Sequence, residues 1–178
     1  MPKSLADGRT RVAILSVKPK DPLKPTVEEL NAGIDASCRI LSSDYNVGAT
    51  ASETLDEKPL CVEGNAQALG ASNAQIEFSA FRYFDEKGKA ETGGQDEIGD
   101  KLYQAVKVKG TRLWLYQRET SKKSTEAWAA GDEVDGFEFE TDNPQSTDRT
   151  GYIKRRIVGI FQDMWLNGEV AGTCLLYT

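Results

Sequence analysis

The stretch AWAAGDEVDGFEFETD, residues 127–142, joins a turn sequence to the clearest acidic strand pattern in the chain. After its second glycine the residues alternate, with Phe137 and Phe139 separated by Glu138 and followed by Glu140. Because successive side chains of a strand point to opposite faces, this pattern buries two rings on one face and displays two carboxylates on the other. The stretch therefore predicts a β-strand with one apolar and one acidic face.

The acidic face belongs to a longer run that lacks positive charge. Residues 128–148 contain no Lys or Arg. Their acidic residues are Asp132, Glu133, Asp135, Glu138, Glu140, Asp142 and Asp148. Three uses of Glu138 and Glu140 stay open at this point: they line a channel, they pair with Lys154 and Arg156 of the following strand, or they face solvent. Opposite charges on neighbouring strands contribute only about 0.2–1 kcal/mol each, so the energy of pairing does not decide among the three.

The composition is that of one soluble domain. The chain has 178 residues, of which 39% are hydrophobic and 28% charged, and this predicts a single domain over residues 1–178 with a real core. Its net charge of -6 argues against holding nucleic acid, because that task needs a basic surface. No apolar run is long enough to span a membrane, and the charged N-terminus is unlike a signal peptide, so we expect no membrane anchor.

Histidine and cysteine usage narrows the possible chemistry. The chain has no histidine, which removes the Ser-His-Asp and Cys-His nucleophile arrangements and the common zinc sites. The cysteines Cys38, Cys61 and Cys174 are widely spaced, which predicts reduced and partly buried thiols in a cytoplasmic compartment. We therefore expect a protein that is not an enzyme and that uses no cofactor or metal.

The rest of the chain predicts a mainly β protein. Aromatic and β-branched residues mark further strands at residues 10–17, 34–41, 74–84, 111–119 and 152–166, with a turn at Asn167–Gly168. Together with the opening stretch they predict a β-sandwich or barrel of about seven or eight strands.

Helices and loops complete this expectation. The capping-box sequence TVEE at 26–29 begins a short helix that Gly33 ends, and an apolar stripe over residues 96–109 predicts one α-helix flanking the sheet. Residues 42–72 have no clear period. They predict a long projecting loop with one or two short strands around residues 53–62.

Three stretches in this order and spacing resemble a known family. They are the first strand leading into PTVEELNAGIDASCRI at 25–40, the aromatic strand at 74–84 before the helix, and AWAAGDEVDGFEFE at 127–140. Over residues 8–172 the chain resembles the tail tube proteins, or major tail proteins, of long-tailed siphophages that infect actinobacteria. The resemblance implies a structural virion protein with a tail-tube-type β-sandwich or barrel, located in the virion tail and assembled in the host cytoplasm.

The resemblance also implies the assembly and its partners. Six subunits of such proteins close into a ring, and the rings stack into a hollow tube through which double-stranded DNA passes at ejection. The implied partners are further copies of the chain, the tape measure protein, the tail terminator and the distal tail or baseplate proteins. A tail terminator or neck ring protein remains an alternative, as does a non-catalytic β-sandwich binding module.

The resemblance gives candidate roles to particular residues. The candidates for lining the lumen are Gln75, Glu77, Glu138 and Glu140, since like charge prevents DNA from adhering to the wall. The candidates for contacts between subunits are Lys154, Arg155, Arg156 and Trp114. Residues 1–9, the loop 42–72 and residues 169–178 are the candidate arms between subunits.

Overall fold

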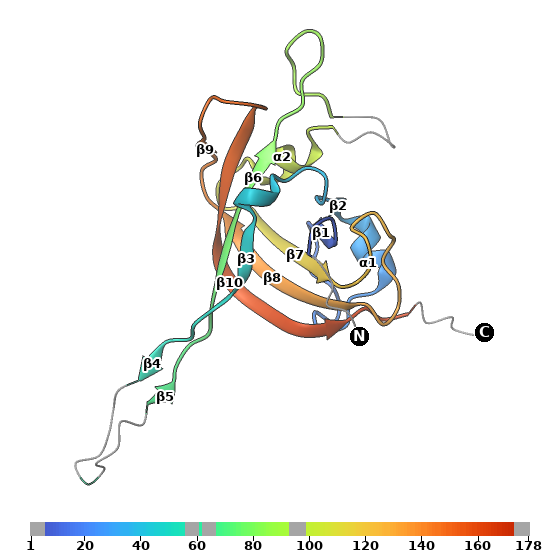
Figure 1. Ribbon diagram of the computed structural model, residues 1–178. Coiled ribbons are helices and arrows are strands. Elements are labelled where there is room, and N and C mark those ends of the chain that lie inside the picture. The colour runs from blue at the N-terminus through green and yellow to red at the C-terminus, as the bar shows by residue number, and fades with distance from the viewer. Residues whose placement is uncertain (1–5, 56–60, 62–66, 93–98, 173–178) are drawn as a thin grey trace.

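The computed structural model describes residues 6–55, 61, 67–92 and 99–172. These residues form one strongly curved antiparallel sheet with the strand order β2-β1-β7-β8-β10-β6-β3, to which the short β9 adds alongside β10 (Figure 1). The strands of this sheet are β1 (Thr10–Leu15), β2 (Ile34–Asp35), β3 (Asn46–Thr50), β6 (Asn73–Phe81), β7 (Arg112–Glu119), β8 (Glu133–Thr141), β9 (Gln145–Ser146) and β10 (Lys154–Glu169). The mainly β prediction is confirmed, with one sheet that curves around its own core.

Two short helices accompany the sheet, one at each of the two places where the sequence predicted a helix. Helix α1 (Val27–Ala32) begins with the predicted capping box, in which Thr26 accepts from the Glu29 backbone and the Glu29 side chain accepts from the Thr26 backbone. Gly33 ends α1 with an extended φ of -77°. Its lack of a side chain matters because a Cβ there would lie 2.9 Å from the Ile14 carbonyl oxygen.

Helix α2 (Lys101–Val106) is shorter than the predicted helix at 96–109. Residues 96–98 lie outside the described part of the chain. Leu102 and Val106 are buried, as the apolar stripe predicts, and the chain leaves the helical path after Val106. Gly110 then turns the chain with a φ of 80°, which favours glycine.

The strand expected at 34–41 is much shorter in the structure. Only Ile34 and Asp35 pair with β1, and the chain then turns, with the Arg39 amide donating to the Ala36 carbonyl. The ladder stops because the next β1 amide, that of Val12, donates to the Ser37 hydroxyl oxygen at 3.0 Å instead of to a backbone carbonyl.

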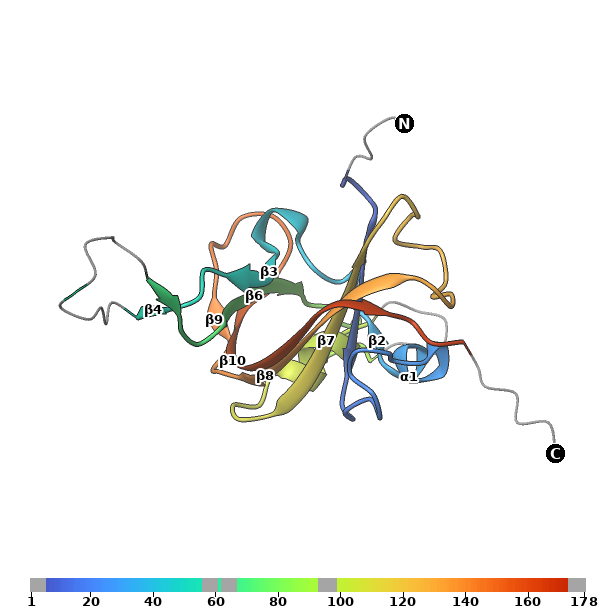
Figure 2. The same cartoon turned by 90° about the horizontal axis from the view of Figure 1, so that it is seen from below.

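The segment 42–72 contributes a strand to the sheet as well as a projection. A 3-10 turn, η1 (Ser42–Asp44), leads into β3, which pairs with β6 along its whole length. The chain then leaves the sheet as an arm, whose described ladder consists of β4 (Thr54–Leu55) and β5 (Ala68–Leu69). Figures 1 and 2 both show this arm at the end of the molecule away from α1. Residues 56–60 and 62 of the expected short strands lie outside the described residues.

The last strand continues through the predicted turn. Strand β10 runs to Glu169, and at Asn167 and Gly168 it forms a bulge in which the pairing with β8 shifts register. Asn167 takes a φ of 55°, and its amide donates to Asp135 at 2.9 Å. A Cβ on Gly168 would lie 2.7 Å from the Leu23 carbonyl oxygen, so the two residues let the strand bend beneath a passing loop.

Each face of the curved sheet carries its own core. On the concave face the buried side chains come from five strands and α2, and the largest are Ile14, Ile76, Leu102, Leu115, Phe78, Phe137, Phe139 and Ile157. A smaller cluster on the convex face packs α1 and Trp128 against β1 and β7. Val170 belongs to that cluster, so residues 169–171 of the expected C-terminal arm are part of the fold.

The prediction that the cysteine thiols are partly buried is wrong for the two cysteines that the structure describes. Cys38 and Cys61 are both exposed, because the strand expected to carry Cys38 is a turn and Cys61 lies in the arm. Cys174 lies outside the described residues.

A buried ion pair holds the convex cluster together. Arg118 is fully buried and donates to an Asp132 carboxylate oxygen at 2.7 Å, while its guanidinium lies 5.3 Å from the centre of the Trp128 ring. Its other Nη N–H groups donate, at 2.9–3.0 Å, to the carbonyls of Lys123, Glu126 and Ala127. The pair thereby ties the loop at 120–132 to β7.

The stability of the fold depends in part on pH, through the ionisation of the Asp132 carboxylate. Burial acts to raise the pKa of Asp132, but hydrogen bonds from Lys122, Ala129 and Arg118 outweigh it and hold that pKa below its usual value. Because the folded pKa lies below the unfolded one, the carboxylate stabilises the fold fully above about pH 4 and loses this contribution as the pH falls through the folded pKa. We expect the urea midpoint of unfolding to decline below about pH 4, and to decline less in Asp132→Asn, whose side chain does not titrate. Equal acid dependence of the two proteins would contradict this role.

Candidate functional site

The strand register brings the four predicted lumen residues onto one face of the sheet. Val158 of β10 pairs with Glu77 of β6, and Ile160 of β10 pairs with Glu140 of β8. Directly paired residues point to the same face, and so do residues two apart on one strand. Gln75 therefore shares the face of Glu77, and Glu138 shares the face of Glu140. This is the convex face, outside the area that α1 covers.

Two arginines lie among these carboxylates. Arg112 of β7 contacts Glu140 at 2.6 Å and Glu138 at 3.4 Å, and Arg156 of β10 contacts Glu77 at 2.6 Å. The hydrogen bond from each arginine to its glutamate raises the pKa of that guanidinium. We call the residues Gln75, Glu77, Arg112, Glu138, Glu140 and Arg156 the charged face.

Glu138 is the most enclosed carboxylate of the charged face, with 7% of its surface exposed. Besides Arg112, it contacts the Lys18 ammonium at 3.3 Å. The Lys18 ammonium also lies 4.8 Å from the centre of the Trp165 ring. Each carboxylate of the charged face thus has a cationic partner. The charged side chains of this face, which lie on β6, β7, β8 and β10, therefore form ion pairs.

Of the three alternatives for Glu138 and Glu140, the structure contradicts pairing with Lys154 and Arg156. The first residues of β10 pair with β6 and β9, and β8 joins β10 only from Gly159 onward, so that Glu140 lies opposite Ile160. Arg156 therefore meets Glu77, and Lys154 pairs with Asp148 at 3.1 Å.

Arg155 and Trp114, which were also predicted to contact other subunits, lie apart from each other in the structure. Arg155 donates to the Lys154 carbonyl at 3.1 Å and lines a hollow with residues 146–149 and 151–154. Trp114 is half-buried on the convex face, opposite Glu138 in the ladder, and its Nε1 is a buried donor with no partner among the described residues. The contacts of these residues with other subunits stay a prediction.

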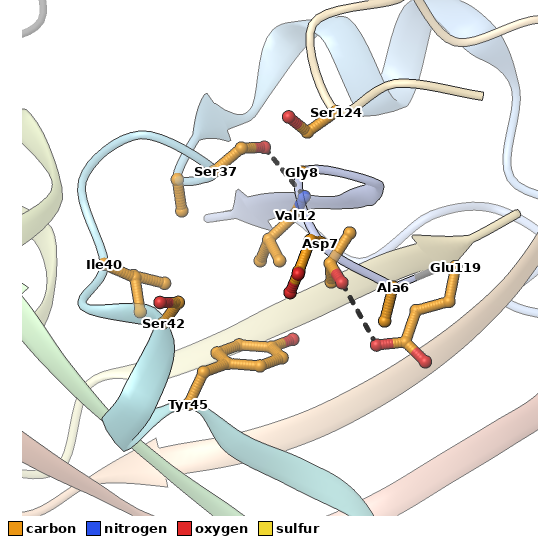
Figure 3. A pocket seen from close by; sticks show the side chains of 12 residues that line it. Ala6, Asp7, Gly8, Val12, Ser37, Ile40, Ser42, Tyr45, Glu119 and Ser124 are labelled. Atoms are coloured by element: carbon orange, nitrogen blue, oxygen red, sulfur yellow. Dashed lines mark hydrogen bonds between the residues drawn. The ribbon is translucent and has the colours of Figure 1, made fainter. Parts of the chain in front are cut away.

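A cavity of about 530 Å³ opens on the concave side, between the two edges of the curved sheet. Figure 3 shows Ile40, Ser42 and Tyr45 along one side of it and Glu119 on another. Thr10 donates to the Glu119 carboxylate at 3.2 Å, and the Tyr45 hydroxyl donates to the Gln117 side chain at 2.6 Å. Burial, and then nearby carboxylates, raise the pKa of Tyr45, so its hydroxyl stays a donor, and it joins the start of β3 to β7 across the cavity.

The structure contains no metal-binding cluster of three or more Cys, Asp or Glu side chains within the described residues. Of the helices in the described part, none is both long and apolar enough to cross a membrane.

Sequence reasoning missed Arg112 and Lys18 as the partners of Glu138 and Glu140. Arg112 precedes Glu138 and Glu140 by more than 25 residues, and Lys18 lies about 120 residues before Glu138. The alternation in β7 puts Arg112 on the same side as Trp114, which is a weak signal that this side faces outward. Nothing in the local sequence around Lys18 indicates its partner.

Comparison with known proteins identifies a family. A family model described as "Phage tail tube protein" matches residues 1–173. No curated protein matches the chain.

Proposed function

The chain belongs to the phage tail tube protein family, a non-catalytic family of structural components of the virion tail, and from this we propose that six copies close into a ring and that the rings stack into a hollow tube for DNA ejection. The charged face then lines the lumen. The tail is that of a long-tailed siphophage of actinobacteria, in keeping with the resemblance of residues 25–40, 74–84 and 127–140.

The observation that carries this proposal is the asymmetry of the sheet. Its concave face is filled by the subunit's main core, whereas the convex face over β6, β10 and β8 bears charged side chains and no covering layer among the described elements. A sheet face left open in this way is free to face a water-filled channel. The charged face holds the three carboxylates in ion pairs, so the wall offers DNA phosphates no free cation from Arg112 or Arg156.

The sheet edge supports ring closure. Strand β3 pairs with β6 on one side, and on its other side no strand pairs with it among the described residues. Unpaired edges bind further strands readily, and closing them across subunits into a common barrel removes them. At its ends the tube would contact the tape measure protein inside it, the tail terminator, and the distal tail or baseplate proteins.

Electron microscopy of the purified protein at high concentration tests the proposal. We expect hollow tubes that show six-fold symmetry in end-on views. Rings that never stack would instead favour a terminator or neck ring. A monomer at every concentration tested would exclude both kinds of assembly.

The ion pairs of the charged face lead to a prediction on DNA binding. In Glu138→Gln/Glu140→Gln, Arg112 and Lys18 lose their carboxylate partners and become free to bind phosphate. We expect a fluorescent duplex to gain anisotropy with this variant at about 50 mM salt and to lose it by about 200 mM, because such binding releases counterions. The wild-type protein should give no gain.

A control with the same change in net charge separates the local effect from the global one. Glu133 and Glu169 are exposed and lie opposite each other on β8 and β10, and no ion pair joins either to the described residues. We expect Glu133→Gln/Glu169→Gln to leave DNA unbound. Equal binding by the two variants would mean that net charge, rather than release of Arg112, governs adhesion. Adding Arg112→Gln to the first variant should weaken its binding, because only Lys18 is then released.

A further inference from the structure

Two hollows adjoin at Tyr152, just before β10 begins. The aromatic hollow has a volume of about 340 Å³ and is lined by Cys38, Phe81, Arg82, Tyr83 and Tyr152. The basic hollow has a volume of about 190 Å³ and is lined by residues 146–149 and 151–155, on the connection from β9 to β10. Tyr152 borders both hollows, and 83% of its surface is exposed. None of the lining residues belongs to the charged face.

The aromatic hollow is held in shape by contacts within the fold. The Tyr152 ring stands edge-on against Phe81, with the ring centroids 6.0 Å apart. The Arg82 amide donates to the Ile153 carbonyl at 2.9 Å, which joins this turn to the end of β6. The Arg82 guanidinium contacts the buried Asp100 carboxylate at 2.9 Å, so its charge is already paired. The hollow therefore offers ring surface rather than free charge, which favours a flat, weakly polar group as its occupant.

The basic hollow keeps positive charge after its internal ion pair is taken into account. Lys154 contacts the Asp148 carboxylate at 3.1 Å, so these two charges offset each other. Arg149 and Arg155 remain, and no ion pair joins either of them to the described residues. The Ser146 hydroxyl adds a neutral donor to the same lining. Guanidinium groups beside hydroxyl donors bind phosphate well, because their N–H groups match its oxygens.

The two hollows together fit a ligand that carries a flat ring and a phosphate on one molecule. We propose that they bind a nucleotide. Its base lies against the rings of Tyr83 and Tyr152 in the aromatic hollow. Its 5′-phosphate accepts hydrogen bonds from Arg149 and Arg155 in the basic hollow. A DNA duplex keeps its bases stacked and offers this site phosphates alone, so the site adds little affinity for duplex DNA. The proposal does not depend on ring assembly.

Titration calorimetry of the full chain with adenosine 5′-monophosphate (AMP) tests the site. At about 50 mM salt we expect AMP to bind, and to bind less tightly as the salt is raised, because the phosphate contacts are ionic. Ribose 5-phosphate, which lacks the base, should bind at least about fivefold more weakly, the lower limit of what stacking on an aromatic ring contributes. Adenosine, which lacks the phosphate, should also bind more weakly. Ribose 5-phosphate that binds as tightly as AMP would overturn the proposal, and so would absence of AMP binding.

A parallel titration distinguishes the two sources of this chemistry, a free nucleotide and the end of a single DNA strand. The probe is a single-stranded oligonucleotide with a 5′-terminal phosphate, added to the protein with AMP already bound. Displacement of AMP at similar concentrations would support the proposal with strand ends as the ligand. AMP binding without such displacement would support it with free nucleotides as the ligand.

Variants in each hollow separate the two contacts. Arg149→Gln/Arg155→Gln should lower the affinity for AMP to that for adenosine, and Tyr152→Ser should lower it toward that for ribose 5-phosphate. Circular dichroism should show unchanged melting, because these side chains are exposed or half-buried. Lys20→Gln/Lys24→Gln removes the same charge at exposed positions outside both hollows and should leave AMP binding unchanged. Equal losses in the arginine and lysine variants, or no loss in either site variant, would overturn the proposal.

The native cysteines give a second measurement on the unmodified protein. Cys38 lines the aromatic hollow, whereas Cys61 lies in the arm, and both are exposed. A base bound in the hollow should slow the reaction of Cys38 with a maleimide and leave the rate at Cys61 unchanged, as measured by mass spectrometry of the tryptic peptides. Equal rates with and without saturating AMP at Cys38, or equal slowing at both cysteines, would overturn the placement of the base.

Discussion

Arg118→Met is expected to lower the free energy of unfolding by about 3–5 kcal/mol, the usual loss when one partner of a buried ion pair is removed. The substitution leaves the Asp132 carboxylate, which is 4% exposed, without its guanidinium. It also removes the donors that three loop carbonyls accept from. For a chain of this size the melting temperature should fall by roughly 6–20 °C, measured by circular dichroism.

Arg112→Met is the matched control for this prediction. Arg112 lies on the same strand and face as Arg118, and its ion pairs to Glu138 and Glu140 are also short. However, half of its side chain is exposed, and exposed ion pairs contribute about 0–1 kcal/mol. Similar losses in the two variants would show that burial of Arg118 is not what makes its pair important.

Combining the substitution with a change at its partner tests whether the pair acts as a unit. Asp132→Asn alone weakens the same contact from the other side. If the two side chains stabilise the fold through each other, the loss in Arg118→Met/Asp132→Asn should be smaller than the sum of the single losses, by about 0.5–3 kcal/mol. Additive losses would assign the effect of Arg118 to its carbonyl contacts alone.

Gly159→Val is expected to destabilise the fold by about 1–3 kcal/mol or more, as insertion into a filled core does. Gly159 lies where β10 exchanges one partner strand for the other, opposite Ile76 of β6 and Thr141 of β8. A Cβ there would lie 2.6 Å from Phe139 and 2.8 Å from Ile76, and both of those side chains are buried. Urea unfolding followed by tryptophan fluorescence would measure the loss.

The same substitution at Gly48 separates crowding from the general effect of replacing a strand glycine. Gly48 lies in the edge strand β3, and a Cβ there meets nothing within 4 Å. Because valine suits a strand better than glycine, Gly48→Val should be neutral or slightly stabilising in the monomer. A loss at Gly48 equal to the loss at Gly159 would contradict the close-packing explanation.

The predictions that the structure confirms depend on residues close together in the chain. The capping box joins Thr26 to Glu29, three residues later, and the alternation of Phe137 and Phe139 needs only the strand itself. The wrong predictions depend on distant residues. Ser37 ends the ladder of β2 through a hydrogen bond to Val12, and the apparent turn at Asn167 is a bulge because β8 and the loop at Leu23 hold that part of β10.

The charged face illustrates the same division. Alternation alone put Glu138 and Glu140 on the face opposite the buried rings, and the structure agrees. Their partners could not be predicted, because Arg112 and Lys18 reach them through strand pairing and a loop that returns across the convex face. The buried Arg118 was likewise missed, since an arginine in an alternating strand gives no local sign of burial.

By itself, the amino-acid sequence determined the mainly β class, the positions of the central strands and the capped start of α1, because propensity, alternation and capping act within a few residues. Only the tertiary structure decided which strands are neighbours, where β10 changes partner, and which cation meets each carboxylate of the charged face. Those features follow from register, which distant backbone pairs and the shared core select together. A shift of one residue would move every side chain of a strand to the other face, and no local pattern excludes it.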